Sequence, residues 1–382
     1  MLPTDYRAHY NLPDDLHFLD GAAQGPQLRA VTEAGIDAVR RKEVPTSIRA
    51  EHYFEPVARL RASFAELLGV SAHCIATVPS VSYAMASVAR VIDVPAGKRI
   101  VSVADVFPSS YYTWSAYAKT RGCTFELIGP PAGSEDFAAD WNARLLDAID
   151  DTCGLAVVPP VHWITGVAFD LSDVRRHCDA VGARLVVDAT QWLGARPFDF
   201  ESVRPDALTC AGYKWLGHPY ALGYLYLADD LHDGVPLEQN WSTRRGAKDF
   251  ARLTHWTEEY QPGAVRFTMG EAANFINVAM GQVALDQLLA WGPAAVAAHT
   301  SYLVGGYWAR FEALGYALPS SRFRVGHLFS LALPEGADPV QLRADLQEAR
   351  VAVSLRGEYI RVSPHVSSRE EDLDALVGVL NR

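Results

Sequence analysis

The sequence that decides the fold is RLVVDATQWLGARPFDFESVRPDALTCAGYKWLGHPYALGYLYL, which covers residues 184–227. It begins with a short apolar run that ends in Asp188, and a second apolar run, residues 207–210, leads to Lys214. Each run has the length of a buried strand. Because ligands of open α/β sheets bind beyond the carboxyl ends of the strands, we expect Asp188 and Lys214 to face one ligand.

An aspartate and a lysine in one crevice suit a cofactor that has a cationic ring nitrogen and an aldehyde. Pyridoxal phosphate has both, since an aspartate partners its pyridinium nitrogen and a lysine forms a Schiff base with its aldehyde. Either residue alone is more often structural, but the two in this pattern predict a cofactor site. A nicotinamide oxidoreductase is disfavoured, because no GxGxxG motif follows an early strand.

The motifs DATQ, GYKWLG and GYLYL, in this order, resemble the class V aminotransferase family of pyridoxal-phosphate (PLP) enzymes. That family includes cysteine desulfurases, kynureninase and isopenicillin N epimerase, and the resemblance covers nearly the whole chain. It implies the α/β fold of PLP-dependent transferases of fold type I. We therefore expect a large domain with a mostly parallel seven-stranded sheet between helices, and a smaller α+β C-terminal domain.

The alternation of strand-like and helix-like segments independently favours a mostly parallel sheet that is covered on both faces. Among the expected elements are helices over residues 26–42, 271–291 and 296–314, and strands over 327–333 and 351–355. The predicted divisions of the chain are an N-terminal arm (1–25), a PLP-binding domain (26–270), a linking helix (271–293) and a small C-terminal domain (294–382).

The resemblance assigns the catalytic roles to Lys214, which would carry the Schiff base and act as general base or acid, and to Asp188, which would keep the ring nitrogen protonated. It implies that Gln191 hydrogen-bonds the phenolic oxygen of the ring. It also implies that the hydroxyl of Tyr213 reaches the phosphate, and the alternative for Tyr213 is a place in the core.

A phosphate site is expected where Pro79 precedes Ser80, Val81 and Ser82, because free N–H groups at a helix start bind anions. The alternative is that one of the two serines only caps this helix. The resemblance favours the phosphate, with Ser82 as the better hydroxyl donor. It also places Gly270 near the cofactor, where the family has a Gly-Thr that donates to the phosphate of a partner subunit. Here Glu271 follows Gly270, so that contact is altered.

The segment PPVHWITG follows a predicted strand and carries His162 and Trp163. In the family, this loop supplies the residue that lies over the cofactor ring. When the loop is aligned on Trp-x-Thr-Gly, the usual histidine falls at Pro160. Either His162 or Trp163 therefore takes the stacking role, or that face of the ring is open. A packing pair is the alternative for His162 and Trp163.

Arg361 ends a predicted strand, and its guanidinium suits two-point binding of a carboxylate. It resembles the family arginine that binds the α-carboxylate of the substrate, and Arg356 is a second candidate. The small residues Ala22 and Ala23, in FLDGAAQGP, are candidate substrate contacts. Trp241 is another, in the aromatic-rich and aperiodic segment 232–270, which we expect to form a dimer interface with shared active sites.

Composition limits the partners. Thirty-four basic and 45 acidic residues give a net charge of −11, which disfavours nucleic acid. No apolar run approaches the roughly 20 residues needed to span a bilayer, and the N-terminus lacks a signal peptide pattern. The five cysteines are scattered without metal-ligand spacing, so we expect reduced thiols, a cytoplasmic location and no metal.

The sequence thus predicts a PLP-dependent enzyme that acts on an α-amino acid, with aminotransferase as the first expectation. A C–S or C–C lyase and an amino-acid epimerase remain as alternatives. Persulfide-relay desulfuration is disfavoured, because no cysteine follows Cys210. A ligand sensor without catalysis is also disfavoured, since the lysine is retained and no DNA-binding module is present.

Overall fold

The computed structural model describes residues 5–382, and its centre is a seven-stranded sheet with the order β2-β8-β7-β6-β5-β3-β4. Neighbouring strands run parallel except at β8, which is antiparallel to both β2 and β7. The expected sheet is therefore confirmed. Its strands are β2 (Ile75–Val78), β3 (Arg99–Val103), β4 (Thr124–Ile128), β5 (Cys153–Val158), β6 (Arg184–Asp188), β7 (Ala207–Ala211) and β8 (Gly223–Leu227).

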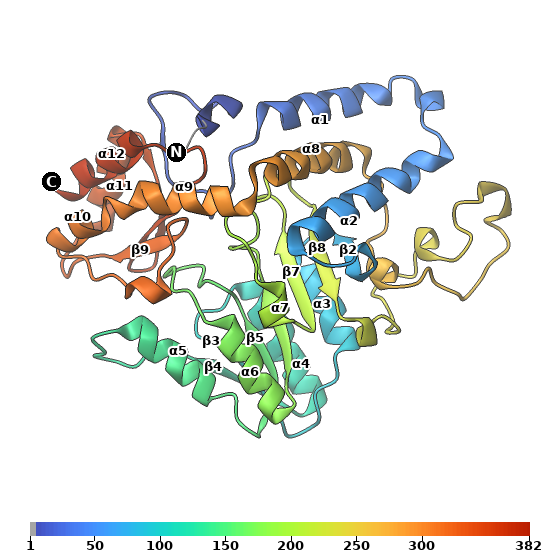
Figure 1. Ribbon diagram of the computed structural model, residues 1–382, viewed down its shortest axis with the longest axis horizontal. Coiled ribbons are helices and arrows are strands. Elements are labelled where there is room, and N and C mark those ends of the chain that lie inside the picture. The colour runs from blue at the N-terminus through green and yellow to red at the C-terminus, as the bar shows by residue number, and fades with distance from the viewer. Residues whose placement is uncertain (1–4) are drawn as a thin grey trace.

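Helices cover both faces of this sheet, as the apolar character of its strands requires. One face packs against α3 (Val81–Val91) and α4 (Pro108–Arg121). The other packs against α2 (Glu55–Leu68), α5 (Phe137–Asp147), α6 (Leu171–Val181), α7 (Phe200–Val203) and α8 (Phe275–Trp291). Helix α1 (Arg29–Arg41) lies outside α8, and Figure 1 shows the two side by side.

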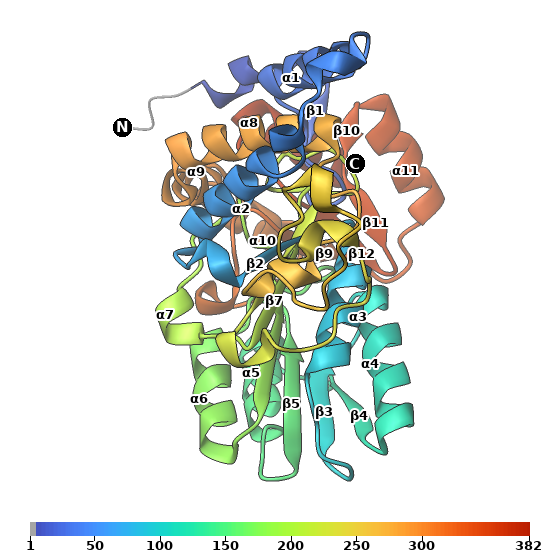
Figure 2. The same cartoon turned by 90° about the vertical axis from the view of Figure 1, so that its right-hand side faces the viewer.

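A second sheet lies at one end of the first (Figure 2). Its antiparallel order is β11-β12-β9, and its helices share a separate hydrophobic cluster. The elements of this part are α9 (Pro293–Gly305), α10 (Trp308–Ala313), β9 (Phe329–Ala332), α11 (Pro339–Glu348), β10 (Val351–Ala352), β11 (Ser354–Arg356), β12 (Tyr359–Val362) and α12 (Glu370–Leu380).

The N-terminal arm joins the C-terminal elements instead of standing alone. Strand β1 (His17–Phe18) pairs in parallel with β10. For this reason the strand expected over residues 351–355 is two short strands, because β10 follows the arm whereas β11 follows β12. The helix expected over 296–314 is likewise two helices, α9 and α10, which are separated at Gly306 and Tyr307.

Three one-turn 3-10 helices are the only helical elements of segment 232–270, at Trp241–Thr243, Phe250–Arg252 and Ala264–Phe267. The expected lack of periodic structure there is confirmed. Within residues 5–382, no helix has both the length and the apolar character that crossing a membrane requires.

Candidate active site

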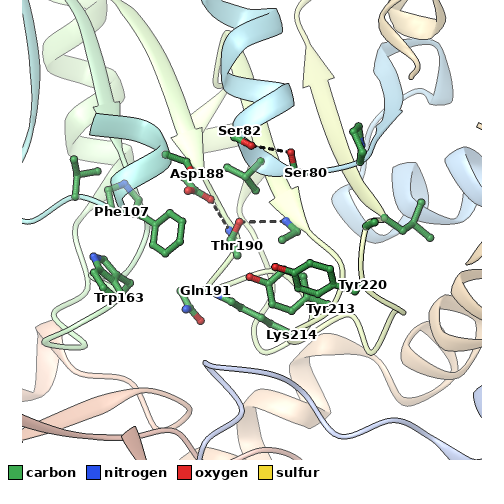
Figure 3. A pocket seen from close by; sticks show the side chains of 18 of the residues that line it. Ser80, Ser82, Phe107, Trp163, Asp188, Thr190, Gln191, Tyr213, Lys214 and Tyr220 are labelled. Atoms are coloured by element: carbon green, nitrogen blue, oxygen red, sulfur yellow. Dashed lines mark hydrogen bonds between the residues drawn. The ribbon is translucent and has the colours of Figure 1, made fainter. Parts of the chain in front are cut away.

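A cavity of about 230 Å³ opens at the edge of the large sheet where its parallel strands end (Figure 3). Such a volume is several times that of a water molecule, about 30 Å³. Loops that follow β2, β3, β5, β6 and β7 supply its walls, as expected for a ligand site of an open α/β sheet. Lining residues from these loops include Ser80, Val81, Ser82, Phe107, Trp163, Asp188, Thr190, Gln191, Tyr213 and Lys214.

Asp188 is the last residue of β6 and lies within this cavity. The backbone N–H of Thr190 donates to its Oδ1 at 3.1 Å. No cationic side chain among residues 5–382 forms an ion pair with it within 4.0 Å. Burial raises the pKa of Asp188, and the hydrogen bond to Thr190 and the charge of Lys214 oppose this rise.

Lys214 enters the same cavity from the loop after β7, and only 6% of it is exposed. Its Nζ lies 5.6 Å from the ring centroids of both Phe107 and Tyr213. Burial lowers the pKa of Lys214 to about 8, and the Asp188 carboxylate offsets part of this effect. A buried amine with this pKa is a nucleophile and base near neutral pH.

The two charged groups therefore share a cavity without forming an ion pair. A buried carboxylate without a cation is costly unless a ligand supplies one. The ring nitrogen of PLP would supply that cation to Asp188, and its aldehyde would meet the amine of Lys214. The residues present fit this cofactor.

The expected phosphate segment opens α3. Ser80 is the N-cap, since its Oγ accepts the backbone N–H of Tyr83 at 3.1 Å, and it lies 2.8 Å from the Oγ of Ser82. Ser80, Val81 and Ser82 all line the cavity, so capping and exposure to a ligand occur together. Across the cavity, the ring of Tyr213 packs on that of Tyr220 at 4.6 Å.

Of the two adjacent candidates His162 and Trp163, only Trp163 lines the cavity. His162 is 1% exposed and does not line the cavity, because its ring nitrogens lie 3.0 Å from Thr165 Oγ1 and 3.1 Å from the carbonyl oxygen of Ala104. Trp163 does line it, and its edge packs on Phe107 at 5.3 Å. Phe107, which the sequence patterns did not point to, thus lies as near to Lys214 Nζ as Tyr213 does.

The amide of Gln191 is largely committed to the protein. Its Oε1 accepts the Trp215 indole N–H at 2.9 Å, and its Nε2 donates to the carbonyl oxygen of Ala22 at 3.0 Å. Ala22 and Ala23 do not line the cavity, although Ala22 contacts its wall through Gln191. The arm continues to Gly25, whose N–H donates to the carbonyl oxygen of Tyr213 at 3.1 Å.

Arg361 is buried beside the loop of Trp163. Its Nη1 donates to the carbonyl oxygen of Trp163 at 3.1 Å, and its Nη2 lies 3.4 Å from Oδ1 of Asp20. Its Nε is buried without a hydrogen-bond partner among the described residues. Arg356 is half-buried on β11, close enough that its charge, like that of Arg361, contributes to the lowered pKa of Lys214.

Trp241 and Gly270 are further predicted site residues that do not line the cavity of this single chain. Trp241 packs edge-on against Phe54 and Phe250 and is 41% exposed. The backbone N–H of Gly270 donates to the carboxylate of Glu238. The structure of one chain does not bring either residue to Lys214.

Residues 17–376 match the family model described as "Aminotransferase class-V". The chain belongs to the class-V aminotransferase family. Its cofactor is pyridoxal phosphate, and it is a PLP-dependent enzyme of this family.

Proteins of similar sequence include different kinds of enzyme. The chain is 26% identical over 316 residues to the uncharacterized aminotransferase YcbU of Bacillus subtilis (82% of this chain, 80% of that one). It is 23% identical over 330 residues to isopenicillin N epimerase of Streptomyces clavuligerus (84% and 83%). It is also 27% identical over 279 residues to kynureninase of Deinococcus radiodurans (69% and 63%).

Solved structures share the fold at lower identity. A lysine-to-alanine mutant of C-DES, with glycine covalently linked to its PLP cofactor, superposes with a TM-score of 0.85 at 20% identity and covers 99% of both chains. A complex of the cystine C-S lyase C-DES with cysteine persulfide has a TM-score of 0.82 at 22% identity (96% of this chain, 97% of that one).

Proposed function

We propose that this enzyme is an aminotransferase that acts on an α-amino acid. The observation that carries the proposal is that, among residues 5–382, Lys214 is the only amine lining the cavity. The other titratable groups there are Asp188, which would be committed to the ring nitrogen, and the phenols of Tyr213 and Tyr220. Burial raises the pKa of Tyr213, so its phenol stays protonated. Transamination needs one base that moves a proton between two carbons joined through the amino nitrogen, and a single lysine suffices.

When bound, PLP supplies an electron sink for the bond that breaks at the substrate Cα. We propose that Asp188 partners its ring nitrogen, that Ser80, Ser82 and the N–H groups at the start of α3 hold its phosphate, and that Phe107 covers one face of its ring. Gln191 contributes its remaining N–H. Tyr213 and Tyr220, whose rings pack together, would close one side of the site.

Arg361 is proposed to bind the α-carboxylate of the amino acid. Its free Nε and its contact with the Trp163 loop support this role, because a carboxylate reaching that loop would meet a guanidinium with an unused donor. With the carboxylate fixed, Lys214 would take the proton from the substrate Cα and, as an ammonium, would return it to the former aldehyde carbon of the cofactor, two bonds away. Orientation of the substrate then decides which bond at Cα breaks.

A lyase that breaks a bond at Cβ is the second candidate. It is favoured by the names of relatives that include kynureninase and a probable hercynylcysteine sulfoxide lyase of Mycobacterium tuberculosis, the latter 29% identical over 245 residues. The same lysine and arginine would serve such a reaction.

An assay with a panel of amino acids, with and without a 2-oxo acid as acceptor, distinguishes the two candidates. An aminotransferase converts the added 2-oxo acid into its amino acid and does not turn over without it. A lyase releases sulfide, ammonia or a cleaved side chain without any acceptor. Turnover that is independent of the acceptor would refute the aminotransferase proposal.

We also propose a homodimer. Segment 232–270 and its surroundings expose large apolar side chains, with Trp256 92% exposed and Val235 53% exposed. Monomers rarely expose apolar patches of this kind. Tyr220 lines the cavity yet is 66% exposed, so a second copy would complete the wall of the site. Light scattering of the purified protein tests this, and Trp256→Ser should shift the mass from dimer towards monomer.

A further inference from the structure

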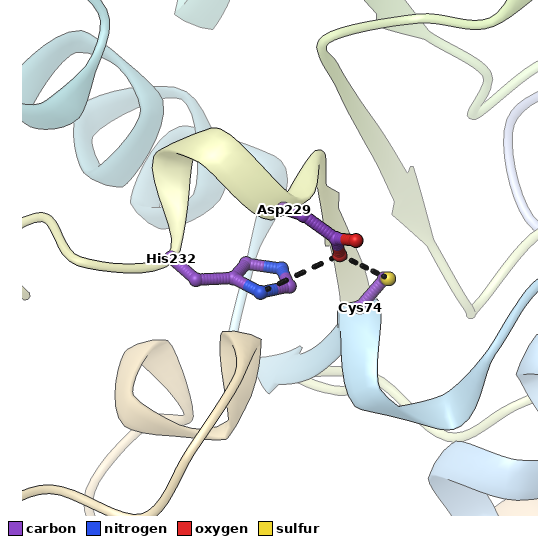
Figure 4. A group of neighbouring side chains, drawn as sticks. All are labelled: Cys74, Asp229 and His232. Atoms are coloured by element: carbon purple, nitrogen blue, oxygen red, sulfur yellow. Dashed lines mark hydrogen bonds and ion pairs between the residues drawn. The ribbon is translucent and has the colours of Figure 1, made fainter.

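A second group of ligand-type side chains lies away from the cofactor cavity, where β2 begins and β8 ends (Figure 4). Cys74 directly precedes β2, and Asp229 and His232 directly follow β8. Antiparallel pairing of these strands brings the three together although 155 residues separate Cys74 from Asp229 along the chain. One ligand atom from each residue lies within 4.8 Å of the other two.

We propose that Cys74, Asp229 and His232 form a zinc site that links the start of the edge strand β2 to the end of its neighbour β8. A thiolate, an imidazole and a carboxylate are ligands that Zn²⁺ accepts, and three protein ligands leave a fourth position for water. His73, whose ring centroid lies 5.1 Å from that of His232, is the nearest further imidazole.

Two of the three distances between the ligand atoms are close to those around a tetrahedral zinc ion. Typical bonds of zinc to sulfur, nitrogen and oxygen place neighbouring ligand atoms about 3.4–3.6 Å apart. Here the Sγ of Cys74 lies 3.3 Å from Oδ1 of Asp229, and the Nδ1 of His232 lies 3.7 Å from the same oxygen. The third separation, between Cys74 and His232, is below 4.8 Å.

The hydrogen bonding of His232 supplies an independent reason. Its Nε2 lies 3.0 Å from the carbonyl oxygen of Leu227, which only accepts, so Nε2 carries the proton. In the neutral ring, Nδ1 then presents a lone pair towards the carboxylate of Asp229. A cation between Nδ1 of His232 and Oδ1 of Asp229, which lie 3.7 Å apart, would bind a lone pair of each atom.

This arrangement is also the one that metal sites use to orient a histidine, since a ligating imidazole usually donates its other N–H to a carbonyl or carboxylate. The thiol of Cys74 donates to Oδ1 of Asp229 at 3.3 Å. Zinc would replace the proton of that thiol, because a coordinating thiol is deprotonated. The site is open to solvent through Asp229, whose side chain is 83% exposed.

Zinc binding to the purified holoenzyme tests the proposal. After equilibration with Zn²⁺ and dialysis, metal analysis should find one zinc per chain in the wild type. Cys74→Ser and Asp229→Asn should weaken binding by more than about 100-fold. Control variants are Cys123→Ser, which removes another half-buried thiol, and Asp230→Asn, which removes the adjacent carboxylate, and both should bind as the wild type does.

Three further measurements test whether the metal binds at this site. Tetrahedral Co²⁺ should give visible bands at longer wavelengths than the cofactor absorbs, in the wild type but not in Cys74→Ser. Zn²⁺ should also raise Tm of the wild type and slow alkylation of Cys74 by iodoacetamide. The proposal is overturned if the wild type retains no zinc, or if the Cys74 and Asp229 variants retain as much zinc as the controls. The proposal is supported if the Cys74 and Asp229 variants lose zinc while their cofactor spectrum stays the same as that of the wild type.

Discussion

The large sheet and the C-terminal sheet each bury charged groups, but they treat them in opposite ways. Asp188 and Lys214 share a cavity with no ion pair, and burial shifts both pKa values towards the neutral forms. Arg361, by contrast, is 2% exposed at its side chain and paired with Asp20. In the large sheet, Asp188 and Lys214 are thus available to pair with a ligand. In the C-terminal part, Arg361 is already paired with a carboxylate of the protein.

The largest expected effect is on the unpaired lysine. Lys214→Ala should lower turnover by about 10⁴-fold, since it removes both the covalent anchor and the base. Borohydride reduction followed by peptide mass spectrometry should find the cofactor attached to Lys214 in the wild type and to no residue in the variant. Lys42→Ala, an exposed lysine on the surface, is the matched control and should leave turnover unchanged. Retained turnover in the Lys214 variant would remove the catalytic assignment.

The next largest effect is at Asp188, where a substitution should lower turnover without lowering stability. Asp188→Asn keeps the hydrogen bond from Thr190 but removes the charge, so turnover should fall by about 10³-fold. The cofactor-free variant should nevertheless be at least as stable as cofactor-free wild type, because a buried carboxylate without a cation is costly. Chemical denaturation of both cofactor-free proteins measures this. A clear loss of stability would mean that Asp188 has a structural partner.

Asp20→Asn, unlike Asp188→Asn, should destabilise the cofactor-free protein. It leaves Arg361 buried without its carboxylate, so the free energy of unfolding should fall by about 3 kcal/mol. Burial raises the pKa of Asp20, which limits the loss, but Ser354 and Arg361 oppose that rise. Denaturation of this variant beside Asp188→Asn is the direct comparison of the two regions. Equal effects at the two positions would contradict the distinction between an unpaired and a paired site.

The sequence patterns revealed Asp188 and Lys214 because both close a short apolar strand, and that pattern is local. They did not reveal Phe107, since the loop VFPS after β3 has no feature that distinguishes a ligand contact from packing. Nor did they separate His162 from Trp163, because which of two adjacent side chains faces a cavity depends on the turn. Residues that meet only through strand pairing, such as Cys74 and Asp229, have no signal in the spacing along the chain.

A smaller effect is the pH dependence of stability that the unpaired Lys214 should cause. Burial lowers the pKa of Lys214 from 10.5 to about 8 in the folded protein. Between these two pH values the unfolded chain binds a proton that the folded chain does not, so stability rises with pH in this window. Below pH 8 the cost of burying the charge is fully present, and it reaches at most about 3 kcal/mol. Denaturation of the cofactor-free wild type and of Lys214→Met should show a stability difference that shrinks as pH rises from 8 to 10.5.

The smallest expected effect concerns the arm that links the two regions, since Asp20 reaches Arg361 and Gly25 reaches the lysine loop. A Cβ built on Gly25 lies 2.0 Å from the carbonyl oxygen of Lys214, so Gly25→Ala must displace one backbone or the other. We expect a loss of about 1–3 kcal/mol in stability. Because the displaced group carries Lys214, turnover should fall more than stability alone explains. Gly305→Ala, where nothing lies within 4 Å of the added methyl, is the matched control and should change neither quantity. If Gly25→Ala lowers stability but leaves turnover intact, the arm braces the fold without positioning the lysine.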